Sequence, residues 1–229
     1  EVDDLITFLK SIGANIKKMG DSITISPVDS LKKQKKSYEI IPDRIEAGTF
    51  MYLGCLPQNK ITIKNVDLGA LKDVIKTVIK IGAKVEKSEN KITVTAPKEI
   101  KKLNIETNPY PSFPTDLQAQ LMSVLVLSRG TSKIKENVFP NRFIHVAEMR
   151  KLGAKIDVVK NTAKIIGVDT LAGAKMQASD LRASAGLVLS ALCASGKSEI
   201  FRIYHLDRGY EAIDNKLKRI GAKIWRTKE

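Results

Sequence analysis

Hydrophobic residues along this chain follow two different helical patterns. The segment 71–79 is amphipathic, with apolar residues at i, i+3, i+4, i+7 and i+8 on one face. Those apolar residues are Leu71, Val74, Ile75, Val78 and Ile79. The segments 117–127 and 183–193 are instead apolar all round. Because a helix that is hydrophobic on every side must be buried on every side, these two segments are expected inside the molecule.

Short segments between the predicted helices alternate apolar and polar residues, which is typical of strands with one solvent-exposed face. Ile61 and Ile63 belong to one such segment, and 84–94 has the pattern of two strands joined by a turn. Further short strands are expected at Ile134 and Ile200. Buried helices and half-exposed strands together predict an α/β fold with the helices inside and mixed sheets outside.

A Gly-Ala turn recurs four times along the chain, each time after a helical pattern. Its glycines are Gly13, Gly82, Gly153 and Gly221, separated by 69, 71 and 68 residues. Each is expected to be the left-handed residue that ends a helix before a strand begins. Apolar helices followed by short strands start between these turns, at Asp43, Asp116 and Asp180. The chain is therefore predicted to repeat one α/β unit of the βαβαββ type.

The first repeat is incomplete. Residues 1–41 contain a predicted helix, the Gly-Ala turn and strands, but no Asp-started helix precedes them. Because the middle of a repeat is an odd place for a natural domain to start, we expect this chain to be the C-terminal part of a longer protein.

Composition excludes several classes of protein. The 229 residues contain no run of eighteen apolar residues and begin with acidic residues, which predicts a cytoplasmic protein with neither a membrane span nor a signal peptide. Cys55 and Cys193 lie in apolar helical runs without metal-ligand spacing, so we expect reduced core residues and no metal site. The net charge is +14, but 30 lysines and only 9 arginines are scattered along the chain and aromatics make up 5%, which argues against nucleic acid as a partner.

Asp116 and Asp180 are the candidate catalytic residues, because each places a carboxylate at the start of a buried helix. Either residue has an alternative interpretation as a helix N-cap and nothing more. Arg142 and Arg208 lie in the strand-to-helix loops of successive repeats, so all four are expected on a common rim. Arginines beside carboxylates suit a substrate with phosphate and carboxylate groups, although each arginine has an alternative interpretation as a surface residue.

Other polar residues near these loops have simpler interpretations. Arg182 is interpreted as a partner for Asp180 or for a neighbouring carbonyl, which leaves it outside the predicted site. His145 and His205 have neither metal-ligand spacing nor a nearby serine or cysteine nucleophile, so a hydrogen-bonded structural role is expected for both.

Four motifs in order resemble those of the UDP-N-acetylglucosamine 1-carboxyvinyltransferase family of enolpyruvyl transferases. They are FPTD at 113–116, ENVFPNRFIH at 136–145, DLRAS at 180–184 and RIYHLDRGYE at 202–211. The resemblance implies two lobes, each an inside-out α/β barrel of three repeated units with buried helices and outward mixed sheets. Residues 1–41 then match the end of the first lobe, and 42–229 match the second lobe.

The same resemblance implies an activity. These enzymes move the enolpyruvyl group of phosphoenolpyruvate to the 3-hydroxyl of UDP-N-acetylglucosamine and release phosphate, which is the first step of peptidoglycan synthesis, and they use no cofactor. Asp116 matches the carboxylate that accepts the hydroxyl proton and binds the sugar, and Asp180 matches one that stabilises positive charge beside the reacting carbon. The main chain of Val138 matches a contact to the sugar nucleotide. Arg142 and Arg208 match arginines that face phosphoenolpyruvate.

Part of the family pattern has no counterpart in this sequence. In the family, the first half of the polypeptide contains a mobile loop with an acid cysteine and a lysine-asparagine pair near the N-terminus. No stretch of this sequence resembles either of them. We therefore expect the N-terminal half of the enzyme as a partner and no activity from this chain alone. Two alternatives stay open, namely the shikimate-pathway enolpyruvyl transferase and a basic binding module without catalytic activity.

Overall fold

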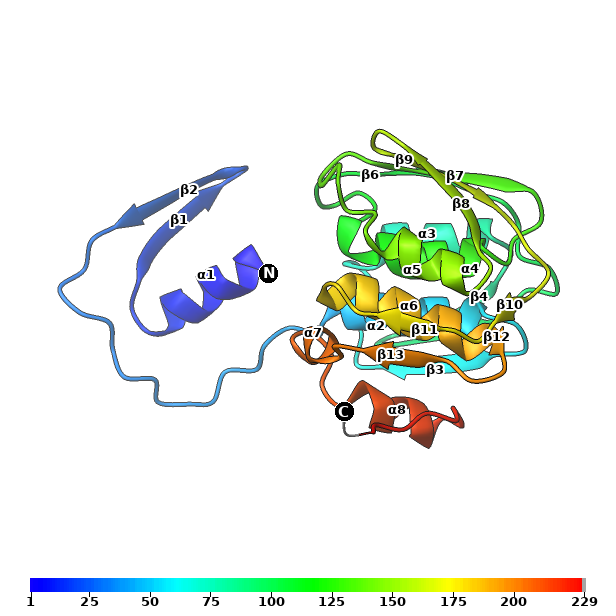
Figure 1. Ribbon diagram of the computed structural model, residues 1–229. Helices are drawn as coiled ribbons and strands as arrows, with labels where there is room; N and C mark the ends of the chain where they lie inside the picture. Colours follow the sequence, from blue (N-terminus) through cyan, green and yellow to red (C-terminus); the bar gives the residue numbers. More distant parts are fainter. Residues whose placement is uncertain (228–229) are drawn as a thin grey trace. The chain divides into compact units, whose positions relative to one another are not determined.

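The computed structural model describes residues 1–227, which divide into two compact units, Glu1–Asp43 and the chain from Arg44 onward (Figure 1). The first unit consists of helix α1 (Val2–Ser11) and an antiparallel hairpin of β1 (Asn15–Met19) and β2 (Ser22–Ser26). The segment 27–43 follows without helix or strand. The Tyr38 hydroxyl donates to Asp4 Oδ1 at 2.8 Å, and the Tyr38 and Phe8 rings meet edge to face at 5.2 Å. These contacts join the irregular segment to α1.

The second unit contains both helices and strands, from α2 at Arg44 to α8, which ends at Arg219. Its helices are α2 (Arg44–Cys55), α3 (Lys72–Lys80), α4 (Gln118–Leu125), α5 (His145–Lys151), α6 (Leu181–Cys193), α7 (Tyr204–Asp207) and α8 (Ile213–Arg219), and a 3₁₀ turn, η1 (Thr115–Leu117), leads into α4. Its strands are β3 (Lys60–Lys64), β4 (Lys84–Ser88), β5 (Lys91–Thr95), β6 (Asn104–Thr107), β7 (Thr131–Glu136), β8 (Lys155–Val159), β9 (Thr162–Ile166), β10 (Leu171–Ala172), β11 (Lys175–Gln177), β12 (Ala194–Ser195) and β13 (Glu199–Phe201).

The described strands of this unit form four sheets with both parallel and antiparallel pairs among them, and two of these sheets share one arrangement. The first is antiparallel with the order β3-β5-β4, and the second has the order β6-β7-β9-β8 with only β6 and β7 parallel. Thus β7-β9-β8 repeats β3-β5-β4. The last repeat has two short parallel pairs, β10 with β12 and β11 with β13. The predicted mixed α/β fold is confirmed.

The two helices predicted to be apolar on all sides are buried, together with α2. All eight residues of α4 are buried, and so are most residues of α2 and α6. In Figure 1 helices α2 to α6 lie between the β6–β9 sheet and strands β3, β11 and β13. The backbones of α4 and α6 approach so closely that a Cβ on Gly186 would lie 2.8 Å from the Ala119 carbonyl oxygen. Gly186 is therefore required for this packing.

The four Gly-Ala turns have the predicted geometry. The φ angles of Gly13, Gly82, Gly153 and Gly221 are 99°, 101°, 94° and 104°. At the first turn, Ala14 N donates to Leu9 O and Gly13 N to Lys10 O, each at 3.0 Å, and the other three turns repeat this pattern. This pair of hydrogen bonds is the Schellman motif, in which a left-handed glycine lets the chain satisfy the last free carbonyls of a helix.

Two expectations from the hydrophobic pattern are wrong. The fourth Gly-Ala turn is not followed by a strand within residues 222–227, because that segment pairs with no neighbouring strand in the described chain. Ile79, placed in the apolar stripe of α3, is 51% exposed, whereas Val74, Ile75 and Val78 are buried. The stripe of this helix is thus narrower than its sequence suggests.

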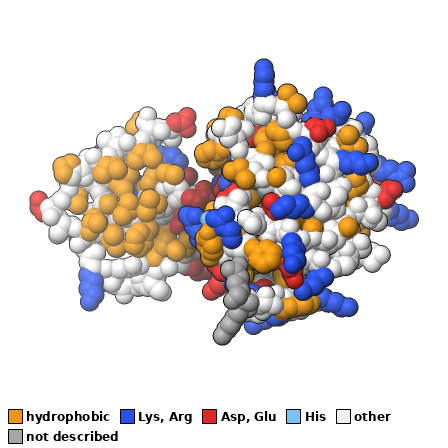
Figure 2. Space-filling view, in the orientation of Figure 1, with side chains coloured by type: hydrophobic (Ala, Val, Ile, Leu, Met, Phe, Trp, Pro, Cys, Tyr) orange, Lys and Arg blue, Asp and Glu red, His pale blue; other side chains and the backbone are white. Residues whose placement is uncertain are grey.

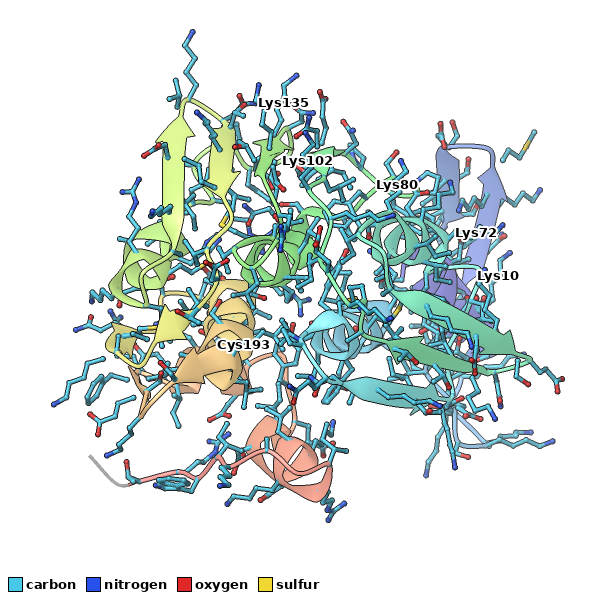
Figure 3. All side chains as sticks on the ribbon, turned by 90° about the vertical axis from the view of Figure 1, so that its right-hand side faces the viewer. Lys10, Lys72, Lys80, Lys102, Lys135 and Cys193 are labelled. Atoms are coloured by element: carbon cyan, nitrogen blue, oxygen red, sulfur yellow. The ribbon has the colours of Figure 1, made fainter. Side chains whose placement is uncertain are left out.

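Residues 1–227 include no helix with the length and apolar character needed to cross a membrane. Cys55 is fully buried in α2, and Cys193 lies partly buried at the end of α6 (Figure 3). Both thiols are free, and burial raises the pKa of each, to about 11 for Cys193. Neither thiol is poised for acid-base chemistry near neutral pH.

Candidate active site

Asp116 lies between two arginine side chains. It belongs to η1, and its Oδ1 accepts from Arg142 Nη1 at 2.8 Å while its Oδ2 accepts from Arg182 Nη2 at 3.3 Å. Arg142 Nη1 also donates to Thr115 Oγ1 at 3.0 Å. No side chain caps η1 or α4, so the interpretation of Asp116 as a helix cap is wrong. The apolar helix instead holds the carboxylate at its mouth, where arginines from two later elements meet it.

This arrangement, named the arginine clamp, comprises Asp116, Arg142 and Arg182. The three side chains are 34%, 21% and 15% exposed, so the clamp is partly buried but reachable from solvent. One carboxylate faces two guanidinium groups, which leaves an excess of positive charge. Planar guanidinium groups pair with phosphate and carboxylate through parallel hydrogen bonds, so the clamp suits an anionic ligand.

Arg182 is the residue that the sequence interpretation missed. Its position two residues after the helix start made it look like a partner for Asp180, and its backbone N–H does donate to Asp180 Oδ1. The side chain turns the other way, toward Asp116, and its guanidinium carbon lies 5.8 Å from the ring centre of Tyr210. The only sequence signal for this role was an arginine at the mouth of a buried helix.

Asp180 caps helix α6. Its Oδ1 accepts from the backbone N–H groups of Arg182 and Ala183, both at 2.9 Å, and its Oδ2 accepts from Ser179 Oγ at 3.3 Å. The cap interpretation is therefore correct for Asp180. Through Arg182, this cap is attached to the arginine clamp, so any chemical role of Asp180 comes in addition to capping.

A buried glutamate shapes the loop that contains Val138. Glu136, at the end of β7, is fully buried, and its Oε1 accepts from Thr107 Oγ1 at 2.6 Å and from the backbone N–H groups of Val138 and Phe139 at 3.0 Å. The N–H of Val138 is thereby occupied. If the main chain of Val138 contacts a ligand, its carbonyl oxygen must make that contact. The guanidinium of Arg142 lies over the Phe139 ring, 5.3 Å from its centre, so the same loop also orients the clamp.

His145 is buried close enough to Asp180 and Arg142 to feel their charges. Burial lowers its pKa to about 4, and the Asp180 charge opposes this shift while the Arg142 charge adds to it. The imidazole is therefore neutral near pH 7. Its Nε2 is buried and has no hydrogen-bond partner among residues 1–227, so the expected hydrogen-bonded role does not hold for this nitrogen. His205 has its Nε2 3.4 Å from Arg202 Nη2, but its Nδ1 is likewise buried without a partner in the described chain.

Arg208 is exposed and directly precedes Gly209. Within the described chain its side chain makes no hydrogen bond or ion pair. The next residue, Gly209, approaches the start of α6 so closely that a Cβ there would clash with Leu181 Cδ1 and lie 3.6 Å from Arg182 Nη1. Of the four predicted residues, Asp116 and Arg142 are thus in contact, Asp180 is joined to them by Arg182, and Arg208 belongs to the loop beside Arg182.

No group of three or more His, Cys, Asp or Glu in the described part of the chain has a geometry that could hold a metal ion. The polar chemistry of this region is that of carboxylates and guanidinium groups.

Comparisons with solved structures define the class of protein. The enolpyruvyl transferase NikO from Streptomyces tendae matches with a TM-score of 0.83 and 25% identity, over 99% of this chain and 54% of NikO. EPSP synthase from Acinetobacter baumannii matches with a TM-score of 0.74 and 16% identity, over 96% of this chain and 54% of that one, a likeness of fold alone. The chain therefore has the mixed α/β fold of enolpyruvyl transferases.

The sequence comparisons then give the family. The family model of EPSP synthase (3-phosphoshikimate 1-carboxyvinyltransferase) matches residues 1–217, and the chain belongs to this family. Relatives named UDP-N-acetylglucosamine 1-carboxyvinyltransferase are 46% identical over 227 residues in Pelagibacter ubique and 47% identical over 229 residues in Thermodesulfovibrio yellowstonii. The resemblance noted from four motifs is confirmed. These matches cover 99% and 100% of the chain but 54% and 55% of the relatives, so the chain spans about half the length of the curated relatives it matches.

Proposed function

We propose that this chain is the C-terminal part of an enolpyruvyl transferase that moves the enolpyruvyl group of phosphoenolpyruvate to the 3-hydroxyl of UDP-N-acetylglucosamine. The observation that carries the proposal is the arginine clamp, in which Asp116 meets Arg142 at 2.8 Å and Arg182 at 3.3 Å. It combines a candidate base with groups that bind phosphate and carboxylate. The names of relatives at 46% and 47% identity support the same reaction.

The proposed architecture assigns residues 1–41 to the end of a first lobe and 42–229 to a second lobe of three repeated units. The burial of α2, α4 and α6 and the repeated strand order support a second lobe built as an inside-out barrel. The rest of the first lobe, with its acid group, is then the partner of this chain.

In the proposed reaction the sugar 3-hydroxyl oxygen bonds to C2 of phosphoenolpyruvate. The hydroxyl proton passes to Asp116, and C3 takes a proton from an acid in the first lobe. The resulting tetrahedral intermediate expels phosphate and loses a proton from C3, which restores the double bond. Asp180 stabilises positive charge that develops at C2 during these steps.

The clamp suggests how Asp116 becomes available as a base. Both of its oxygens accept hydrogen bonds from guanidinium groups. Phosphoenolpyruvate brings a phosphate and a carboxylate, which compete for Arg142 with more negative charge than one aspartate carries. Substrate binding would therefore draw Arg142 away and leave Asp116 Oδ1 facing the hydroxyl. Arg208, which is exposed and precedes Gly209, would also bind phosphoenolpyruvate. Val138 would meet the sugar nucleotide through its carbonyl.

The test is phosphate release by the full-length polypeptide that ends in this sequence. With phosphoenolpyruvate and UDP-N-acetylglucosamine, Asp116→Asn is expected to lower the rate by about 100-fold or more, because the base is lost. Asp73→Asn is the matched control, since Asp73 is a carboxylate on α3 that pairs only with Lys76 in the described chain. Equal rates for the two variants would remove Asp116 from the chemistry.

Phosphate release with another acceptor and an RNA titration at two salt concentrations would test the other candidates. Phosphate release with shikimate 3-phosphate and none with UDP-N-acetylglucosamine would favour the shikimate-pathway enzyme. RNA binding that weakens steeply with salt, without phosphate release, would favour a basic binding module. Against the latter, lysine and arginine side chains are dispersed among other residues over the visible face of the second unit (Figure 2).

A further inference from the structure

We infer that Tyr210 is a positioning residue for Asp116 that acts through the guanidinium of Arg182. The inference rests on the proposed function and deepens it, because it names a residue outside the arginine clamp that sets the orientation of the base. Tyr210 follows the Arg208-Gly209 pair and is 1% exposed, so it cannot touch a ligand. Its effect must pass through its neighbours.

The hydroxyl of Tyr210 is anchored in a buried network that links three segments far apart in sequence. Thr49 Oγ1 lies 2.9 Å from Ile45 O and 2.9 Å from Tyr210 Oη. Gln120 Nε2 donates to Thr49 Oγ1 at 3.2 Å and to Tyr210 Oη at 3.0 Å. The hydroxyl proton of Thr49 goes to the Ile45 carbonyl, which only accepts, so Tyr210 must donate to Thr49. Each hydroxyl group in the network therefore donates to one defined acceptor, and these hydrogen bonds hold the Tyr210 side chain at its hydroxyl end.

The ring of Tyr210 contacts the guanidinium group of Arg182, which makes few hydrogen bonds of its own. Arg182 makes one side-chain hydrogen bond in the described chain, the 3.3 Å contact with Asp116, and its Nη1 is buried without a partner. The guanidinium carbon lies 5.8 Å from the ring centre of Tyr210, within the range of cation–π attraction. A single long hydrogen bond leaves a guanidinium group free to rotate, so the ring supplies the second constraint on its position.

Gly209 lies close to the start of α6. A Cβ at this position would lie 2.4 Å from Leu181 Cδ1 and 3.6 Å from Arg182 Nη1, so the backbone before Tyr210 packs against the helix that carries Arg182. Three neighbouring residues thereby have separate tasks in the proposed enzyme. Arg208 faces substrate, Gly209 permits the close approach, and Tyr210 positions Arg182.

Loss of the ring should affect the chemical step more than substrate affinity. Without it, Arg182 can leave Asp116 Oδ2, and the carboxylate can rotate away from the sugar hydroxyl. A misplaced base lowers kcat, whereas Arg142 and Arg208, which bind phosphoenolpyruvate in the proposed function, remain in place. Tyr210→Leu in the full-length polypeptide is therefore expected to lower kcat about tenfold and to change either KM by less than about twofold. Tyr210→Phe keeps the ring and should retain most of kcat.

The matched control is Tyr52, a fully buried tyrosine of α2 whose hydroxyl lies 2.8 Å from Thr77 Oγ1 and which faces no arginine in the described chain. Tyr52→Leu should lower thermal stability as Tyr210→Leu does, but should leave kcat unchanged. If Tyr210→Leu does not fold, Tyr210→Met fills the space with a flexible apolar chain and removes the ring. An equal loss of kcat in the Tyr52 variant would overturn the inference.

A double-mutant cycle tests whether the effect passes through Arg182. In an Arg182→Gln background, the Tyr210 substitution should lower kcat by less than about twofold further, since the two residues act on one path. Additive losses would overturn the inference. Crystal structures provide a readout without activity: the Arg182 Nη2 to Asp116 Oδ2 distance should exceed hydrogen-bond length in Tyr210→Leu, and an unchanged distance would contradict the inference. A full-length polypeptide that released no phosphate would refute the proposed function, while this distance would still decide the role of Tyr210.

Discussion

Asp180 can be tested by two substitutions that separate capping from charge. Asp180→Ala removes both 2.9 Å bonds to the N–H groups of Arg182 and Ala183, which should lower the free energy of unfolding by about 1 to 2 kcal/mol. Asn caps helices about as well as Asp, so Asp180→Asn should stay within about 0.5 kcal/mol of the original protein. Urea unfolding followed by circular dichroism measures both changes. The difference between the two variants isolates the cap.

The activities of the same variants then isolate the charge. Asp180→Asn keeps the helix start and therefore the backbone of Arg182, but it has no negative charge to stabilise a cationic carbon. We expect phosphate release to fall by about 100-fold or more. An Asn variant with the original kcat would show that Asp180 is a cap alone. An Ala variant as stable as the Asn variant would contradict the energy assigned to the cap.

Four further predictions concern other residues of the second unit. Glu136→Ala leaves two backbone N–H groups without their acceptor and should lower the free energy of unfolding by about 2 to 3 kcal/mol in urea titrations, and Glu136→Gln should recover most of it. The pKa of His145 is lowered from 6.5 to about 4. The contribution of the neutral imidazole to the free energy of unfolding is therefore fully present above pH 6.5 and is lost as pH falls toward 4. Urea titrations from about pH 7 to about pH 4.5 should show a loss of about 2 to 3 kcal/mol that His145→Gln lacks. Arg208→Ala in the full-length polypeptide should raise the KM for phosphoenolpyruvate about tenfold or more and that for the sugar nucleotide little, and equal effects on both would remove it from the phosphoenolpyruvate site. Burial raises the pKa of Cys193 to about 11, so iodoacetamide at about pH 8 should modify it at least about tenfold more slowly than a free thiol, as mass spectrometry can measure.

The helices were predictable because their signals are local. The apolar residues around 117–127 and 183–193 marked α4 and α6 as buried, and burial of all eight residues of α4 agrees with this. The left-handed glycines were equally predictable, since a Schellman turn involves only six consecutive residues. Asp180 as a cap belongs to the same group, because a cap bonds N–H groups two and three residues ahead.

The arginine clamp was predictable only in part. Repeat positions indicated that Asp116 and Arg142 lie on one rim, and the two are in contact. The same positions did not predict that the Arg182 side chain points away from the start of its own helix. Its orientation depends on the close packing of α4 and α6, which brings Asp116 within reach of a residue 66 positions later.

The buried segments, the helix ends and the motifs of the family could be predicted without coordinates, because these features depend on short-range geometry and on the pattern of apolar residues. The partners of most polar groups became clear only in the folded molecule. Tyr210, Gln120 and Thr49 share one buried network although 161 residues separate its ends. The segment 222–227 has a strand-like pattern but no strand, since a strand exists only where a neighbour supplies its hydrogen bonds. Hydrogen bonds between distant residues depend on which helices and strands are neighbours, and tertiary packing determines these neighbours.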